Sequence, residues 1–299
     1  MRSSEKLLPC LLCFAFVGAA LGCQPSTDLG PVASQSAAEE IREALSSESE
    51  GAGGGAEAEV GTGWATLKGR FTFEGTPPEM PAYNVTSDQG TCAAGGAPPQ
   101  ETLIVGNDGG LKNVVIFLRK TSRVHESAEA PAEPLVFDQK KCVFLTHVFT
   151  IPVGQPMEIK NSDPVGHNTK IDGKNSFNRT IPAGESVTFT PKKSEAKPTG
   201  VACSIHPWMN AYMLPHDNGY AAVTLEDGTF EIQNLPAGET LEFQVWHERS
   251  AGSNQGLVVT SDQAKELGWD KKGRFEVKLT ENETTELDIA VPASAFTGG

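Results

Sequence analysis

Two histidines, one cysteine and one methionine have the types and spacing of a metal site. Cys203 and His206 are separated by two residues, and Met209 follows three residues later. A cysteine and a histidine at this spacing, placed where a strand ends, can point toward one position in space. His167 lies upstream, after an Asn-Ser-Asp segment that begins at Asn161. Two imidazoles, a thiolate and a weak axial thioether form the ligand set of blue copper sites, because soft sulfur ligands favour copper and imidazoles suit it too.

Simpler roles exist for each of these residue types. A lone cysteine among apolar residues is usually a buried structural thiol. The joint occurrence of Asn-x-Asp followed by His-Asn, and of Cys-x-x-His-Pro-Trp-Met, favours the metal site instead. His147 is interpreted as structural, with a place beside the metal as the alternative. The other aromatic candidates are interpreted as edge, loop or packing residues: His216 and His247 at the surface or an edge, His125 in an acidic loop, and Trp208 packed beside the site.

From Trp64 onward, short alternating or apolar runs lie between turn residues, which predicts strands. Turn clusters such as Asp227-Gly228 and Pro236-Ala237-Gly238 separate them. Spacing of this kind is typical of β-sandwiches. Short helices are expected only at 262–267 and after His206. The predicted strands cover 66–73, 113–118, 135–137, 143–151, 156–161, 186–190, 201–204, 221–225, 229–233, 242–247, 256–260, 273–279 and 285–291.

The stretch 142–213 resembles a cupredoxin of the plastocyanin kind. Residues 149–155 resemble the family's strand and glycine turn, and residues 157–163 resemble its first ligand strand with an asparagine near the end. His167 and Asn168 fall where the family has its first ligand histidine and the asparagine beside it. The resemblance implies a Greek-key β-sandwich that holds one copper ion.

The same resemblance assigns the ligands. His167, Cys203 and His206 match the three strong ligands, since Cys203 and His206 fall on the family's Cys-x-x-His. The axial position has two candidates. Met209 is preferred because it lies next to the metal-binding turn, and Met213 is the alternative. Met209 also resembles the His-x-x-Met of the binuclear copper domain of cytochrome oxidase, but the loop lacks the second cysteine which that domain needs.

Two further segments resemble carboxypeptidase regulatory-like, or transthyretin-like, sandwiches. Residues 64–120 supply the opening strands, and residues 219–292 supply the Asp-Gly hairpin and the Pro-x-Gly turn. The predicted fold class is therefore all-β, with a cupredoxin-like domain at 134–218 next to or inserted in a second sandwich. We favour the insertion; the alternative is two successive sandwiches, with 64–218 forming an elaborated cupredoxin.

The N-terminal residues have the pattern of an export signal. Arg2 and Lys6 precede the apolar run 7–21, which is too short to be a good membrane-spanning helix. The tetrad Ala20-Leu21-Gly22-Cys23 resembles a bacterial lipobox, which implies a signal peptide at 1–22 and lipidation of Cys23. Gln24 then favours the periplasmic face of the outer membrane. The alternative is an ordinary secretory signal and a secreted or periplasmic protein.

The six cysteines divide unevenly along the chain. Removal of the signal peptide discards two, and Cys23 is the lipidation site. In an oxidising compartment two of the remaining three should pair, and Cys92 with Cys142 is the sensible disulfide because neither has a histidine at ligand spacing. Cys203 is then an unpaired thiol, which a metal would protect from oxidation.

Charge and motifs bound the function. The chain carries a net charge of −14, which argues against nucleic-acid binding. Residues 24–60 hold eight acidic residues and one arginine and no aromatic residue, so 23–60 is predicted to be a disordered acidic tether. Nucleophile-elbow, phosphate-loop and His-Glu-x-x-His motifs are absent, so no enzyme is expected.

These observations favour an exported copper-binding protein that transfers one electron to and from a protein redox partner and is held on the membrane by its lipid anchor. The alternative is a binding or scaffold module that is metal-free or stores copper, including a carbohydrate-associated one.

Overall fold

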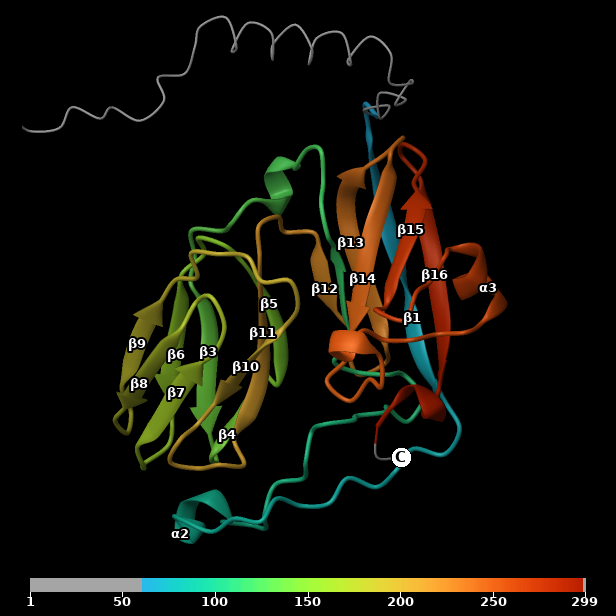
Figure 1. Ribbon diagram of the computed structural model, residues 1–299. Helices are drawn as coiled ribbons and strands as arrows, with labels where there is room; N and C mark the ends of the chain where they lie inside the picture. Colours follow the sequence, from blue (N-terminus) through green and yellow to red (C-terminus); the bar gives the residue numbers. More distant parts are fainter. Residues whose placement is uncertain (1–60, 298–299) are drawn as a thin grey trace, which may run out of the picture. The chain divides into compact units, whose positions relative to one another are not determined.

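The computed structural model describes residues 61–297, so the predicted signal peptide, Cys23 and the predicted tether lie outside the described residues. These described residues form sixteen strands in four sheets, with two helices of five residues or fewer and three short 3₁₀ turns (Figure 1). The predicted all-β, β-sandwich fold is confirmed. No helix among residues 61–297 is long and apolar enough to span a membrane.

The strands between residues 135 and 216 form one pair of sheets, called here the central sandwich. Their sheet orders are β4-β3-β6-β9 and β5-β11-β10-β7-β8. A single buried cluster, which includes Phe137, Ile151 and Ile159, draws side chains from both sheets. The strands are β3 Leu135–Lys140, β4 Val143–Phe144, β5 Val148–Pro152, β6 Met157–Asn161, β7 His167–Ile171, β8 Phe177–Ile181, β9 Ser186–Phe189, β10 Thr199–Ala202 and β11 Asn210–His216.

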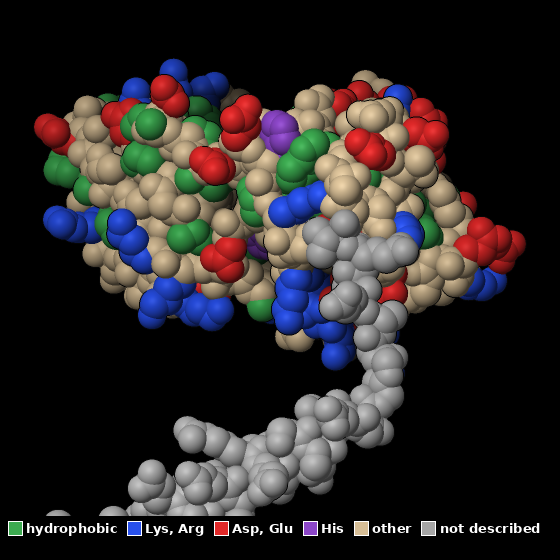
Figure 2. All heavy atoms as spheres, turned by 90° about the horizontal axis from the view of Figure 1, so that it is seen from above, with side chains coloured by type: hydrophobic (Ala, Val, Ile, Leu, Met, Phe, Trp, Pro, Cys, Tyr) green, Lys and Arg blue, Asp and Glu red, His purple; other side chains and the backbone are tan. Residues whose placement is uncertain are grey.

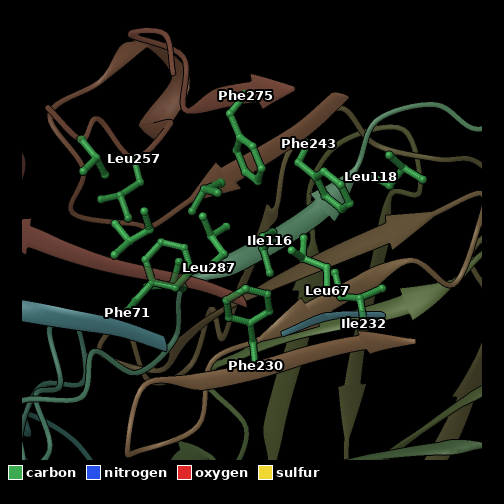
Figure 3. Close-up of a cluster of buried hydrophobic side chains, with 14 of the residues drawn as sticks. Leu67, Phe71, Ile116, Leu118, Phe230, Ile232, Phe243, Leu257, Phe275 and Leu287 are labelled. Carbon is green, nitrogen blue, oxygen red and sulfur yellow. The ribbon is translucent and has the colours of Figure 1, made fainter. Parts of the chain in front are cut away.

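A second pair of sheets, the flanking sandwich, takes its strands from both sides of that stretch. Its sheet orders are β13-β1-β16 and β12-β2-β14-β15, and β1 is parallel to β16. Figure 3 shows its core, where Phe71, Phe230 and Leu287 meet Ile116 and Phe243. The assignment of the two sandwiches to separate domains stays a prediction. The strands are β1 Trp64–Glu74, β2 Val115–Leu118, β12 Ala221–Val223, β13 Thr229–Pro236, β14 Thr240–Trp246, β15 Arg274–Lys278 and β16 Thr284–Pro292.

The helices and turns lie in the connections. Helix α2 is in the long connection from β1 to β2, and α3 precedes β15. The short turn η1 precedes β3, η2 follows β14, and η3 follows β16. Ser261 caps α3 by accepting a hydrogen bond from the Ala264 amide. The bounds are α2 Gln89–Cys92, η1 Glu126–Ala128, η2 Ser253–Gln255, α3 Asp262–Glu266 and η3 Ala293–Ala295.

A small apolar cluster joins side chains of both sandwiches. Phe117 and Trp246 from β2 and β14 are buried with Val148 and Leu214 from β5 and β11. Tyr212 packs against the same cluster, and its ring centroid lies 5.0 Å from that of Trp246. Burial of these rings removes apolar surface of both sandwiches from water, which stabilises the contact.

Several local predictions are wrong. The predicted strand 143–151 is two strands in different sheets, because the chain crosses between sheets at the exposed Leu145. No helix follows His206; β11 occupies 210–216 and pairs with β10 and β5. Residues 256–260 form a loop, although Gly256 makes one bridge to Trp246. Strands β7 and β8 were not expected.

Two histidines expected at the surface or an edge are buried. Nδ1 of His216 donates a hydrogen bond to the backbone carbonyl oxygen of Asn218 at 2.9 Å. Since that oxygen can only accept, Nδ1 carries the proton. His247 accepts at Nδ1 from the Arg249 amide, and burial lowers its pKa to about 3. Burial also lowers the pKa of His216. Both rings are therefore neutral core residues at pH 7.

His147 has a structural role, because its ring joins the central sandwich to the segment after β14. Nε2 lies 2.5 Å from a carboxylate oxygen of Glu248, and Nδ1 lies 3.0 Å from the carbonyl oxygen of Asn210. Both partners accept, so both ring nitrogens donate and the ring is cationic. Burial lowers the pKa of His147, but the hydrogen bond and charge of Glu248, with Glu101, outweigh it and leave the pKa raised.

We predict that His147→Gln destabilises the protein most at acidic to neutral pH. A raised pKa in the folded state gives stability that is fully present below the unfolded value of 6.5 and is lost as pH rises through the folded pKa. The expected loss is about 1.5–3 kcal/mol at pH 6, narrowing toward pH 9. Urea unfolding across this range measures it. His216→Gln is the control, because the lowered pKa of His216 makes its difference from wild type change with pH in the opposite sense. A His147→Gln difference that does not vary with pH would contradict the ion pair.

Candidate metal centre

Three of the sequence-predicted ligands meet at one end of the central sandwich. His167 is the first residue of β7, Cys203 directly follows β10, and His206 lies in the turn from β10 to β11. β10 lies between β7 and β11 in the sheet. The strand order therefore brings together a histidine and a Cys-x-x-His turn that are far apart in sequence.

The three side chains point their ligand atoms at one another. Nδ1 of His167 lies 2.9 Å from Nδ1 of His206, and Sγ of Cys203 lies 3.9 Å from the same His206 nitrogen. All three ligand atoms lie within 4.8 Å of one another. The residues are buried, with 0%, 0% and 3% of His167, His206 and Cys203 exposed.

The sulfur of Cys203 accepts two backbone hydrogen bonds. The amide of Asn168 donates at 3.3 Å and the amide of His206 donates at 3.4 Å. Among the described cysteines, Cys203 alone is free of a disulfide. These two N–H donors fix the position of the sulfur, the atom through which a cysteine binds metals.

A carboxylate holds the outer nitrogen of each histidine. Nε2 of His167 lies 2.7 Å from Oδ2 of Asp163, and Nε2 of His206 lies 2.8 Å from Oδ2 of Asp88. An ionised carboxylate only accepts, so Nε2 of each ring carries a proton. Carboxylate–histidine pairs of this kind fix the tautomer of metal-ligating histidines.

This protonation pattern tests whether a metal fits. Burial lowers the pKa of His167, and the neighbouring His206 lowers it further, against the opposing effect of Asp163. His167 is thus neutral at pH 7, and its Nδ1 lone pair faces Nδ1 of His206 at 2.9 Å. Two lone pairs at this distance repel unless a proton or a cation lies between them. Two imidazoles and a thiolate around such a position fit copper, and the residues present therefore fit the ion.

Two asparagines hold the loops that carry the ligands. The Asn161 side chain donates to the carbonyl oxygens of Val165, Ile181 and Pro182, and it accepts from the Asp163 amide at 3.0 Å. The loop before His167 is thereby closed on itself. The Asn168 side chain accepts from the Ser204 amide and donates to Asn178, so β7 is joined to the cysteine turn.

The two candidate axial methionines lie in different places. Met209 is 1% exposed and closes the ligand turn, because its carbonyl accepts from the Cys203 amide and its amide donates to the His206 carbonyl. Met213 pairs with Thr199, four residues before Cys203 along β10. At about 3.3 Å per strand residue, this register puts the Met213 backbone about 13 Å from that of Cys203.

The disulfide predicted between Cys92 and Cys142 is present, and it lies beside the site. Ligand-type atoms of Cys92, Cys142 and His206 lie within 4.8 Å of one another. Trp208 packs here as expected: its ring centroid is 5.1 Å from that of His206, and its indole N–H donates to the Cys142 carbonyl.

Sequence reasoning missed both carboxylates. Asp163 lies in the Asn-Ser-Asp segment, four residues before His167. That spacing could have indicated a carboxylate partner for the histidine. Asp88 is separated from His206 by 118 positions, and nothing near it in the sequence indicates a role.

Comparisons with known proteins give only distant similarities. No family model and no curated protein matches the chain. Among solved structures, a Cu-containing nitrite reductase from Thermus scotoductus SA-01 is 24% identical over 28% of this chain, with a TM-score of 0.26. The chain spans about a fifth, 22%, of that reductase. Amicyanin from Paracoccus versutus is 21% identical over 34% of this chain and 97% of its own, also with a TM-score of 0.26. A mutant amicyanin in its reduced Cu(I) form is 18% identical over 34% of this chain and 98% of its own, with the same TM-score.

We predict that Asn161→Ala and Asn175→Ala differ in their effect on the site. Each asparagine bonds a loop through both ends of its amide, but Asn175 holds residues 192 and 193, away from the ligands. Both variants should lose about 1–3 kcal/mol of unfolding free energy, because buried backbone groups lose partners. Only Asn161→Ala should also weaken metal binding, by about 10–100-fold. Urea unfolding and copper titration measure the two effects. Equal copper affinities would show that Asn161 does not position His167.

Proposed function

We propose that the chain is an exported copper protein that passes single electrons through a mononuclear site formed by His167, Cys203, His206 and Met209. The observation that carries this proposal is the convergence of two imidazole Nδ1 atoms and a cysteine sulfur on one buried position. Copper bound there supplies one-electron chemistry between its two oxidation states.

The surroundings of the ligands support electron transfer. Each histidine is held at its outer nitrogen, and the cysteine sulfur is held by two amides. All three lie in or next to the strands of a packed sandwich. Ligands fixed in this way rearrange little when the metal changes charge, and electron transfer is fast when little rearrangement is needed.

The axial ligand we propose is Met209. Its backbone closes the turn that contains Cys203 and His206, and its side chain is buried. The strand register supports Met209 over Met213, because Met213 lies further along β11 from the ligand turn. A weak axial thioether tunes the reduction potential of such sites.

Compartment and partners follow from the same sequence features. The disulfide supports an oxidising compartment, in agreement with the predicted export signal. We propose that the chain is a lipoprotein anchored through Cys23 on the periplasmic face of the outer membrane, that its partner is a redox protein, and that it is not itself an enzyme. Acidic and basic side chains both occur on the face shown in Figure 2, which suits transient docking of a protein more than nucleic-acid binding.

We predict that purified protein loaded with copper has an intense visible absorption band from thiolate-to-copper charge transfer, and that Cys203→Ser abolishes it. The band requires the thiolate, so a serine hydroxyl cannot replace it. Visible and EPR spectra together with elemental analysis measure the result. Cys92 and Cys142 cannot supply the thiolate for this band, because their sulfurs are joined to each other.

Two outcomes would count against the proposal. Protein that takes up no copper would exclude the site itself. Protein that holds copper but cannot be reversibly oxidised and reduced would favour copper storage over electron transfer.

We predict opposite behaviour for Met209→Ala and Met213→Ala. Met209→Ala should change the spectrum and the reduction potential of the copper form, because it removes the axial thioether. Met213→Ala should leave both nearly unchanged and lower the unfolding free energy of the copper-free protein by about 2–5 kcal/mol, because Met213 is fully buried in the core. A spectral change in Met213→Ala alone would reverse the axial assignment.

A further inference from the structure

A segment from outside the central sandwich covers the outer edge of His206. Residues 83–97, called here the cap segment, lie in the connection from β1 to β2 and contain helix α2 (Figure 1). Val85 and Cys92 of this segment are buried in the core cluster of the central sandwich, and Tyr83, Ala93 and Ala97 pack against it. His206 has no exposed surface. The edge of a ligand histidine is thereby closed to solvent.

The Cys92–Cys142 disulfide connects both carboxylates that hold the histidines. At one end, the Cys92 amide donates to the Asp88 carbonyl at 2.8 Å, so the helical turn fixes Asp88 relative to the disulfide. At the other end, the Cys142 amide donates to Oδ2 of Asp163 at 2.8 Å. This is the same oxygen that accepts from His167.

The turn at Cys142 is shaped to hold that carboxylate. Lys141 and Cys142 both have left-handed backbone conformations, with φ of 55° and 53°. Successive amides in such turns can point at one anion. The Lys141 amide donates to Oδ1 of Asp163 at 2.7 Å, beside the Cys142 bond to Oδ2. Non-glycine residues adopt this conformation infrequently, so two in a row indicate a turn held by its neighbours.

We propose that the Cys92–Cys142 disulfide holds Asp88 and Asp163 against the outer nitrogens of the two ligand histidines, and that these two positioning residues lower the reduction potential of the copper site. This inference rests on the proposed function. The disulfide acts as a fixed anchor, and no change in its redox state is involved.

The direction of the change in reduction potential follows from the negative charge beside each imidazole ring. A carboxylate that accepts a hydrogen bond from Nε2–H makes the imidazole a stronger electron-pair donor to the metal at Nδ1. Stronger donation and nearby negative charge both favour the more highly charged oxidation state, which lowers the potential. The Asp163 side chain is 4% exposed and that of Asp88 is 44% exposed. Solvent screens Asp88 more, so Asp163 contributes the larger share.

The test uses the copper-loaded protein and charge-neutral variants. Asp88→Asn should raise the potential by about 59 mV or more, which is a tenfold change in the ratio of affinities for the two oxidation states. Asp88→Glu should restore most of the wild-type value. Asp138→Asn is the matched control: Asp138 accepts from the Ser162 hydroxyl next to Asp163 but contacts no ligand histidine. It should shift the affinity ratio less than twofold.

The disulfide is tested by a double variant, Cys92→Ala with Cys142→Ala, which leaves no extra thiol beside the site. It should raise the potential in the same direction as Asp88→Asn. Adding Asp88→Asn to the double variant should then change the affinity ratio less than it does in the wild type, because the carboxylate has already lost its fixed place. Fully additive shifts would overturn the anchoring role.

A second measurement needs no copper. In the copper-free protein, NMR should detect an Nε2-bound proton on His206 that exchanges slowly with water. Asp88→Asn and the double cysteine variant should speed that exchange at least tenfold, and Asp138→Asn should not. Unchanged exchange in Asp88→Asn would overturn the positioning role.

The two measurements separate the proposals. If the protein takes up no copper, the proposed function is wrong. The proton-exchange experiment still tests whether Asp88 holds His206. Protein that binds copper with the thiolate band, but whose reduction potential does not change in Asp88→Asn, contradicts only the effect of the carboxylates on the potential.

Discussion

Two imidazole nitrogens face each other across 2.9 Å inside a protein core, and the rest of the central sandwich depends on how that arrangement is kept. Two unrestrained imidazole rings could turn until one donated to the other. Here neither ring is free to turn, because Asp163 and Asp88 hold the outer protons. The two Nδ1 atoms are therefore kept facing each other beside the Cys203 sulfur. The carboxylates that hold the outer Nε2 atoms thus also fix the direction in which the Nδ1 atoms point.

The fold keeps these groups in place through segments that are distant in sequence. β10 lies between β7 and β11, which sets the distance between His167 and the ligand turn. The side chains of Asn161 and Asn168 then close the loops on either side. These are buried polar contacts with nearly all partners supplied, and such networks specify one geometry because any alternative leaves polar groups unpaired. The rigidity of the candidate site thus comes from hydrogen bonds as much as from the apolar core.

How much was readable from the sequence depends on how local each feature is. The Cys203–His206 turn is a short pattern, and the sequence predicted that it would meet His167. Cysteine counting predicted the Cys92–Cys142 disulfide, but not its place beside the ligands. Asp88 could not be predicted, because the contact spans 118 positions and depends on a loop path that no periodicity encodes. Strand β11 was not predicted for another reason. The Pro-Trp-Met segment before it does not mark the start of a strand, and a short helix was expected there.

Asp88 connects the candidate site to the flanking sandwich. β1 and β2 belong to the flanking sandwich, and the connection between them carries both Asp88 and Cys92. Residues 134–218 contain all the proposed ligands, but they lack the partner of His206 Nε2 and one half of the disulfide. A stretch that looks complete by its ligands is incomplete by its hydrogen bonds. The connection from β1 to β2 of the flanking sandwich therefore contributes to the site. It packs against the core cluster beside the site and supplies the carboxylate that accepts from Nε2 of His206.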